Sequence, residues 1–105
     1  MSKRIGVIIK EPGQKPKHVN ISDSLENLQK WVGGYIECVT LDIGLVMIIN
    51  EEGKIRDLPH NFYLLGDSIR GTAIFAGVEG EEFCDIPVSF QDFKQIFPEL
   101  FEEDR

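Results

Sequence analysis

The chain has 105 residues, of which 42% are hydrophobic and 28% charged, and its formal net charge at pH 7 is −7. This length allows one domain with one core, and the composition is typical of an ordered globular protein rather than a disordered chain. The negative net charge argues against nucleic acid as the main partner, because phosphate binding requires a cationic surface.

The N-terminal part is predicted to form two antiparallel strands. Residues 4–10 are a β-branched run typical of a strand, Pro12 and Gly13 mark a turn, and residues 18–21 return. The apolar run near the N-terminus is too short for a secretory signal, and no run in the chain has the length of a membrane span. We therefore expect a cytoplasmic protein with no membrane contact.

A first helix is predicted at residues 23–32. Asp23 and Glu26 have the spacing of a capping box. Apolar residues recur at helical spacing and predict a buried stripe of Leu25, Leu28, Trp31 and Val32. Gly33 and Gly34 come after the helix, whereas a phosphate-binding loop places its glycines before one. They therefore predict a helix stop.

Two strands joined by a short turn are predicted next. Residues 35–41 and 45–50 are separated by a turn that ends in Gly44, which suits a three-residue hairpin with a bulge. The entirely apolar run at 45–49 predicts a central strand that is covered on both faces. Asn50 and the glycine three residues later repeat the turn pattern, so a third antiparallel strand is expected to begin near Lys54.

An irregular connection and two further strands are predicted between residues 57 and 86. Residues 57–67 lack a clear period and contain Pro59, so they predict an irregular connection. Three apolar side chains are expected to lie beneath it: Phe62, Leu64 and Leu65. Residues 69–76 predict a further strand in which Gly71 marks a bulge, and residues 82–86 predict its partner.

A second helix is predicted at residues 90–97. Ser89 and Asp92 have N-terminal capping spacing, and Pro98 ends the helix. Its apolar residues are expected to face the core: Phe90, Phe93, Ile96 and Phe97. Together, the elements predict one α+β domain over residues 1–105, in which a meander-like antiparallel sheet of about five to seven strands is packed by two helices. Residues 102–105 are expected to fray.

Four segments carry a resemblance to a known family: LQKWVGGYIE, NEEGK, LPHN and IRGTAIFAG. The chain resembles a family of small proteins of unknown function found in bacteriophages, plasmids and integrative elements of gut bacteria. The resemblance extends from residue 11 to residue 77, with VGGYIE as its most specific piece, and the helix after Ile86 lies outside it. It implies an accessory protein of a mobile genetic element and brings no catalytic residues with it.

Residues that could carry chemistry are few and widely spaced. His18 and His60 are distant in sequence, and Cys38 and Cys84 occur singly within strand-like runs. Neither pair has the spacing of a metal site, a disulfide framework or a nucleophile with its base. We therefore expect a non-enzymatic protein with no cofactor and no metal.

The acidic C-terminal part is the first candidate for a binding surface. Residues 79–105 contain nine acidic residues against Lys94 and Arg105. Four of the acids have no packing role that the pattern indicates: Glu99, Glu102, Glu103 and Asp104. Because a field of one sign steers and selects partners, we expect a protein partner, and a basic one fits best. The alternative is a solubilising tail, and a homo-oligomer is compatible with either.

A small-ligand site is the second candidate. Its polar residues would come from the predicted turns and connections, and the ligand would resemble a nucleotide or metabolite. The candidate set is Asn50, Asn61, Asp67 and Arg70. The competing interpretation of these residues is turn chemistry and surface ion pairing.

Overall fold

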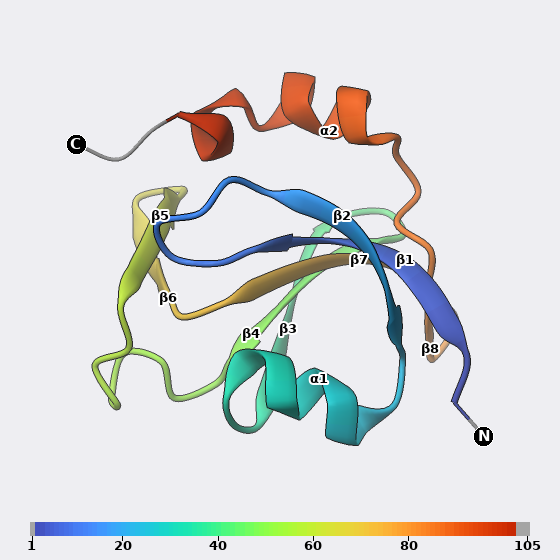
Figure 1. The fold of residues 1–105 in the computed structure, drawn as a ribbon, viewed down its shortest axis with the longest axis horizontal. Coiled ribbons are helices and arrows are strands. Elements are labelled where there is room, and N and C mark those ends of the chain that lie inside the picture. The colour runs from blue at the N-terminus through green and yellow to red at the C-terminus, as the bar shows by residue number, and fades with distance from the viewer. Residues whose placement is uncertain (1, 103–105) are drawn as a thin grey trace.

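The computed structural model describes residues 2–102 and has the α+β architecture expected from the sequence. Its elements in chain order are β1 (Arg4–Lys10), β2 (Lys17–Ser22), α1 (Leu25–Val32), β3 (Ile36–Asp42), β4 (Leu45–Asn50), β5 (His60–Leu64), β6 (Asp67–Arg70), β7 (Ala73–Glu79), β8 (Glu82–Cys84), α2 (Phe90–Ile96) and the 3-10 helix η1 (Pro98–Phe101) (Figure 1).

Six strands form the main sheet, and its strand pairs are antiparallel. The order is β2-β1-β7-β4-β3, with β8 paired to β7, while β5 and β6 form a separate two-stranded sheet. β4 lies between β7 and β3 and is buried along most of its length, so the predicted central strand is confirmed. β2 and β3 stand at the two ends of this strand order among residues 2–102.

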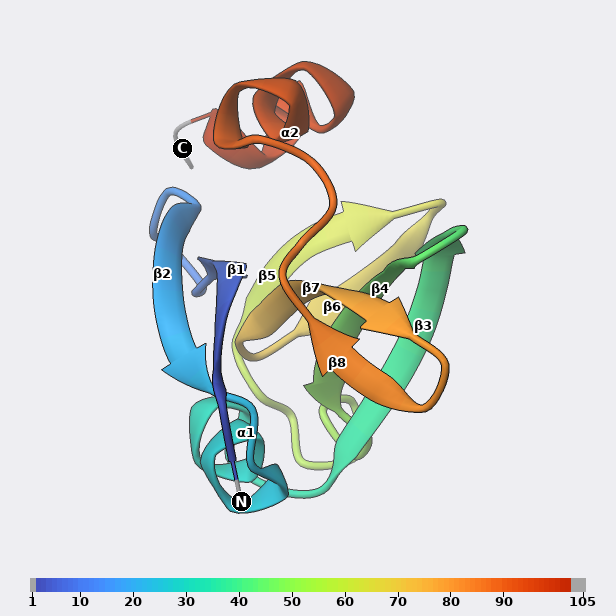
Figure 2. The same ribbon diagram turned by 90° about the vertical axis from the view of Figure 1, so that its right-hand side faces the viewer.

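The two faces of the sheet have different covers, and Figure 2 shows the sheet lying between α1 and α2. On one side, here the α1 face, Leu28 and Val32 of α1 pack with residues of β1, β4 and β7. On the other side, here the α2 face, the cover consists of α2 with η1 and of the β5–β6 hairpin. Phe62 and Ile69 from the hairpin and Phe93 from α2 enter this second half of the core.

The expected strand near Lys54 is absent from the structure. Residues 51–57 form consecutive turns, because the side chain of Asn50 accepts a hydrogen bond from the Glu52 N–H at 2.7 Å and its carbonyl accepts from the Gly53 N–H at 3.2 Å. These bonds turn the chain away from the sheet. The second neighbour of β4 is instead β7. Consecutive strands are therefore neighbours in the main sheet only in the pairs β1–β2, β3–β4 and β7–β8 of the described chain, and the sheet is not one continuous meander.

The region expected to be an irregular connection contains strand β5, which pairs with β6. Gly71 is not a bulge within one long strand: its φ of 82° turns the chain between β6 and β7, and its N–H donates to the Pro59 carbonyl at 2.8 Å. Phe62 is buried and Leu64 partly buried as expected, but Leu65 is fully exposed. It stands at the tip of the β5–β6 hairpin, where no other element within residues 2–102 covers it.

Helix α1 begins two residues later than expected. Ser24 is the N-cap residue and accepts from the Asn27 N–H at 3.2 Å, so Asp23 and Glu26 do not form the expected capping box. Gly33 ends the helix in the left-handed conformation, as expected. Leu28 and Val32 are buried, Trp31 is partly buried, and Leu25 is 56% exposed because it lies in the first turn of the helix.

Helix α2 begins as expected, because the Ser89 hydroxyl accepts from the Asp92 N–H at 3.0 Å. Phe93 is completely buried and Phe97 packs against the same cluster. Phe90 and Ile96 were expected in the core but are 36% and 52% exposed, since so short a helix buries only one narrow stripe. The chain then docks again through η1, where Leu100 is buried.

Candidate functional site

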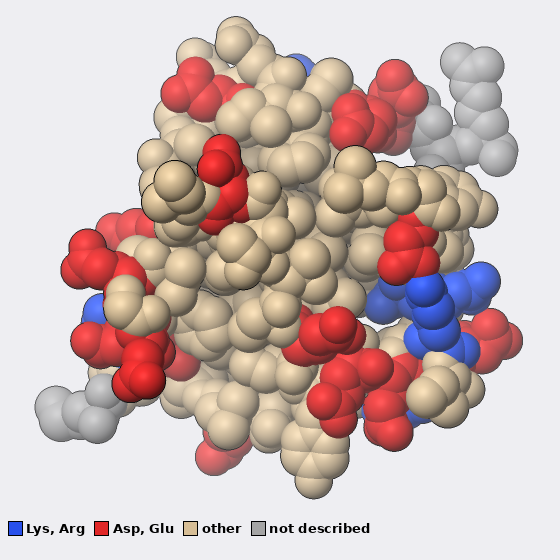
Figure 3. Space-filling view, turned by 180° about the vertical axis from the view of Figure 1, so that it is seen from behind, with Lys and Arg blue, Asp and Glu red and all other residues tan. Residues whose placement is uncertain are grey.

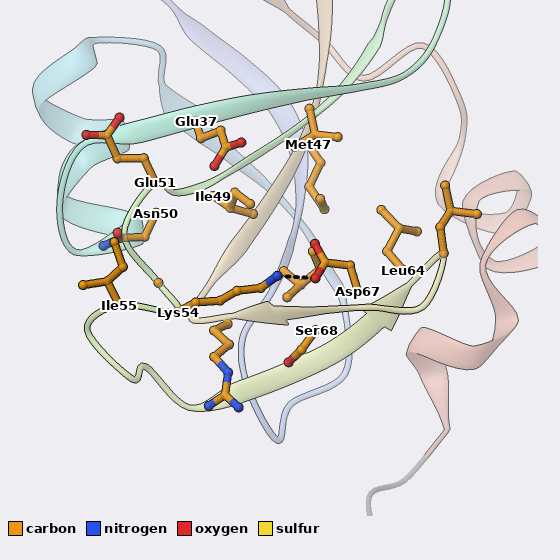
Figure 4. Close-up of a pocket in the computed structure, with 15 residues that line it drawn as sticks. Glu37, Met47, Ile49, Asn50, Glu51, Lys54, Ile55, Leu64, Asp67 and Ser68 are labelled. Carbon is orange, nitrogen blue, oxygen red and sulfur yellow. Dashed lines mark hydrogen bonds and ion pairs between the residues drawn. The ribbon is translucent and has the colours of Figure 1, made fainter.

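A cavity of about 520 Å³ opens on the α2 face, between strands β3 and β4 and the β5–β6 hairpin (Figure 4). Its apolar lining comes from Val39, Met47, Ile49, Leu64 and Ile69. Its polar and charged lining comes from Glu37, Asn50, Glu51, Lys54, Asp67, Ser68 and Arg70. An apolar floor with a few polar groups around it is typical of ligand and partner sites.

The base of the hairpin is held in place by Asn61, which is only 4% exposed. Its amide nitrogen donates to the carbonyls of Lys10 at 2.7 Å and Gly71 at 2.8 Å, and its Oδ1 accepts from the Lys10 ammonium at 3.0 Å. Buried polar groups must be paired in this way, since an unpaired one destabilises the fold. Asn61 therefore fixes the hairpin to β1 and does not line the cavity.

The 51–57 turn forms one end of the cavity and is fixed by Asn50 and Gly53. Besides its bond to Glu52, Asn50 donates to the carbonyl of Val32 at the end of α1, at 3.1 Å. A Cβ on Gly53 would lie 2.9 Å from the Arg70 carbonyl, so only glycine lets this turn approach β6 so closely. The turn is therefore connected to α1 and packed directly against the hairpin.

Two ion pairs connect the turn to the hairpin. The ammonium of Lys54 pairs with the carboxylate of Asp67, and Figure 4 shows the lysine side chain extended along the cavity to reach it. Arg70 donates to the Asp57 carboxylate and to the Leu58 carbonyl, each at 3.2 Å. Both side chains of the Lys54–Asp67 pair are mostly exposed, so solvent screens their attraction.

Large apolar side chains stand uncovered at the rim. Leu65 is 100% exposed and Ile55 is 84% exposed, and both line the cavity. Neither was identified from the sequence as a functional candidate. The available signal was the LLGD segment, in which Leu65 precedes Gly66 in a two-residue loop between strands. Single exposed apolar residues are common, but here two of them lie beside one cavity with an apolar floor.

The residues predicted for a small-ligand site are only partly brought together. Asn50, Asp67 and Arg70 line the cavity, whereas Asn61 is buried beneath the hairpin. The hydrogen-bonding groups of all four already have protein partners: two hold turns and strands in place, and two form ion pairs. The arrangement therefore offers few free polar groups to a small polar ligand.

Of the acidic candidates, Glu99 and Glu102 are exposed and form no ion pair within residues 2–102. Glu103 and Asp104 lie outside the described residues. Figure 3 shows the face opposite to that of Figure 1, where acidic side chains surround a largely uncharged central area and most of the visible basic atoms gather at one side.

Other chemistry-bearing groups are dispersed. Residues 2–102 contain no cluster of three or more His, Cys, Asp or Glu side chains that could hold a metal ion. Partial desolvation and, secondarily, the neighbouring Glu37 carboxylate raise the pKa of the Cys38 thiol. This thiol is therefore less ionised at neutral pH than an ordinary cysteine, which lowers its reactivity. Neither helix in the described part is long and apolar enough to cross a membrane.

Comparisons with known proteins give one match. The family model described as a domain of unknown function, DUF3846, matches residues 3–98. This match continues past Ile86 and includes α2, which the sequence motifs had placed outside the resemblance. No curated protein and no solved structure matches significantly. The chain therefore belongs to the DUF3846 family of domains of unknown function.

Proposed function

We propose that this protein is a non-enzymatic binding module that engages a protein partner through one surface, here called the contact face. The contact face consists of the cavity on the α2 face together with Ile55 and Leu65 at its rim. Support comes from the combination of an apolar floor, a charged rim and two uncovered aliphatic side chains, which is the usual anatomy of a protein interface.

Leu65 is the observation that carries this proposal. It has a φ of 51° and Gly66 has a φ of 81°, so the two-residue loop has positive φ at both central positions. Such turns favour Asn-Gly, because a residue with a Cβ in the left-handed region is destabilised by about 1–2 kcal/mol and asparagine tolerates it best. Leu65 also exposes its whole side chain to water. A partner that covers Leu65 would bury this apolar side chain and gain free energy from it.

The acidic end has a secondary role in this proposal. Glu99 and Glu102 are exposed and add to the net charge of −7, so their field attracts a basic partner and increases its association rate. The cellular setting we propose is a bacterial cytoplasm, with the protein acting as an accessory factor of a phage, plasmid or integrative element. That setting rests on the VGGYIE, NEEGK and LPHN segments.

A nucleotide- or metabolite-like ligand is the second candidate, favoured by the cavity volume alone. At about 520 Å³ it falls within the range of roughly 300–1,000 Å³ that is usual for ligand pockets. The polar candidates around it are engaged within the protein, which favours the protein partner. Native mass spectrometry of the purified protein tests for a retained small molecule.

The decisive variant is Leu65→Asn. We expect it to raise the free energy of unfolding by about 1 kcal/mol, because asparagine adopts the left-handed conformation at lower cost than leucine. Urea unfolding of the variant and the parent measures this change. A partner-binding role predicts the opposite effect on binding: the stabilised variant loses contact with the partner.

Binding is measured by quantitative affinity capture from bacterial lysate with the parent, Leu65→Asn and Leu25→Gln. Leu25 is also an exposed leucine, but it lies on α1 across the sheet, so its variant serves as the matched control. We expect at least one protein to be captured by the parent and the control and lost with Leu65→Asn. If all three capture the same proteins in equal amounts, the contact face is not the binding surface.

A further inference from the structure

We propose that the free edge of β3 receives an extended segment of the partner as an additional strand, and that this segment carries a lysine or arginine beside Glu37 and an apolar residue beside Val39. This inference rests on the proposed protein-binding function and names the class of partner. β3 is the outermost strand on its side of the sheet, as Figure 2 shows, and among residues 2–102 it pairs only with β4.

The register identifies which backbone groups of β3 are available. The Tyr35 carbonyl accepts from the Glu51 N–H at 3.0 Å, so position 35 faces β4. Because alternate residues of an antiparallel strand bond to opposite sides, Ile36, Cys38 and Thr40 direct their N–H and C=O groups away from β4. None of these groups has a hydrogen-bond partner in the described part of the chain. They form a template for another strand.

The opposite edge of the sheet, β2, is protected against pairing with another strand, whereas β3 is not. On β2, the Asn20 carbonyl accepts from the Arg4 guanidinium at 2.7 Å and the Ser22 carbonyl accepts from the Asn27 amide at 2.9 Å. β2 also begins with Lys17 directly after a proline. Lysine, proline and occupied carbonyls are the usual devices that block an edge. β3 contains neither lysine nor proline, and its bulge lies only at its end, near Thr40.

The charges beside this edge indicate which partner fits. Glu37 and Val39 line the cavity, so the added strand's residues next to them would lie on the α2 face. Glu37 and Asp42 on β3 and Glu51 at the cavity rim are exposed, and Lys54 is already paired with Asp67. Opposite charges on neighbouring strands stabilise a pair and like charges destabilise it. A lysine or arginine beside Glu37, with an apolar residue two positions away beside Val39, therefore suits the edge.

A second copy of the chain is a poorer occupant. Pairing β3 with itself would bring two acidic edges together, each belonging to a protein with a net charge of −7. The repulsion between these like charges disfavours pairing of the edge with a second copy. An extended basic segment of another protein has the complementary charge.

The test selects binders from a random-peptide library on the immobilised protein and examines the best peptide by amide hydrogen exchange. We expect enrichment of proline-free peptides in which a lysine or arginine and an apolar β-branched residue stand two positions apart. Binding should slow the exchange of the Ile36, Cys38 and Thr40 amides, whereas Glu37 and Val39 amides are already protected by β4. Glu37→Gln should weaken this peptide about two- to fivefold.

Cys38→Pro provides the backbone control. It removes an outward N–H and leaves the bonds to β4, so we expect a folded protein with peptide affinity reduced at least about tenfold. Cys38→Val keeps the N–H and should bind like the parent. Should the proline variant not fold, the exchange of the three amides in the parent decides the matter.

Three outcomes would overturn strand addition. The first is failure to enrich any peptide, and the second is peptide binding without slowed exchange at the three amides. The third is protection of these amides in the protein alone at high concentration together with dimer formation, which would assign the edge to a second copy. In each case the capture experiment with Leu65→Asn tests the proposed protein-binding function independently of strand addition.

Discussion

The α2 face of the sheet is covered in two different ways at its two ends. At one end, α2 and η1 fill the space with aromatic rings: Phe93 lies 4.9 Å from Phe75 and 5.0 Å from Phe97 between ring centroids. At the other end, the β5–β6 hairpin spans the sheet and leaves a cavity of about 520 Å³. The same sheet therefore has one closed end, where packing is dense, and one open end, which contains the cavity proposed to receive a partner.

The difference in packing between the two ends follows from the elements that cover them, a helix at the closed end and a two-stranded hairpin at the open end. An α-helix places several large side chains on one stripe, and Phe93 and Phe97 fall on the same face. A two-stranded hairpin directs only every second residue inward, so Phe62 and Ile69 reach the core while Tyr63 and Leu65 remain exposed. The open end thus separates residues that hold the fold from residues that are free to bind.

The largest expected effect lies at the closed end. Phe93→Ala removes a completely buried ring and should lower the free energy of unfolding by about 3–5 kcal/mol. The matched control is Phe90→Ala on the same helix, where the ring is 36% exposed and the loss should be clearly smaller. Urea unfolding compares the two. Equal losses would mean that the rings of α2 do not close this end by burial.

A smaller effect is expected where the open end is anchored. Asn61→Ala removes three hydrogen bonds, including those that its amide nitrogen donates to two buried carbonyls, and should destabilise the protein by about 1–3 kcal/mol. Amide exchange should rise within β5 and β6 before it rises in β4. Asn20→Ala, an exposed position on β2, is the control and should change neither quantity. Uniformly faster exchange in β4 would show that the hairpin is not a separate unit.

The sequence identified most of the elements because their signals are local. The run at 45–49 predicted the central strand, and Ser89 predicted the start of α2. The predictions that failed concern segments whose structure depends on contacts with residues distant in the chain. Asn50 resembles a hairpin turn residue, but its amide bonds to Val32 at the end of α1, and this long-range contact directs the chain out of the sheet.

The candidate site was predictable only in part, for a related reason. Asn50, Asp67 and Arg70 do meet at the cavity, yet their ion pairs and hydrogen bonds depend on a register that no local pattern specifies. Leu65 was expected beneath a loop because it is apolar. Its exposure depends on the pairing of Leu64 with Asp67, which makes Leu65 the tip of a tight turn.

The smallest expected effect concerns the ion pair between Lys54 and Asp67, which connects the turn to the hairpin at the open end. Both side chains are about 60% exposed, so an exposed pair of this kind should contribute at most about 1 kcal/mol. A double-mutant cycle with Lys54→Gln and Asp67→Asn isolates the interaction between the two side chains.

We expect this interaction energy to fall further as salt is raised, because exposed charges are screened. A coupling well above 1 kcal/mol that is insensitive to salt would contradict the distinction between a closed and an open end, because the hairpin would then be held as firmly as α2. A weak coupling would instead mean that Lys54 and Asp67 can separate at little expense. Their charges would then be available to a partner strand or side chain that enters the cavity beside them.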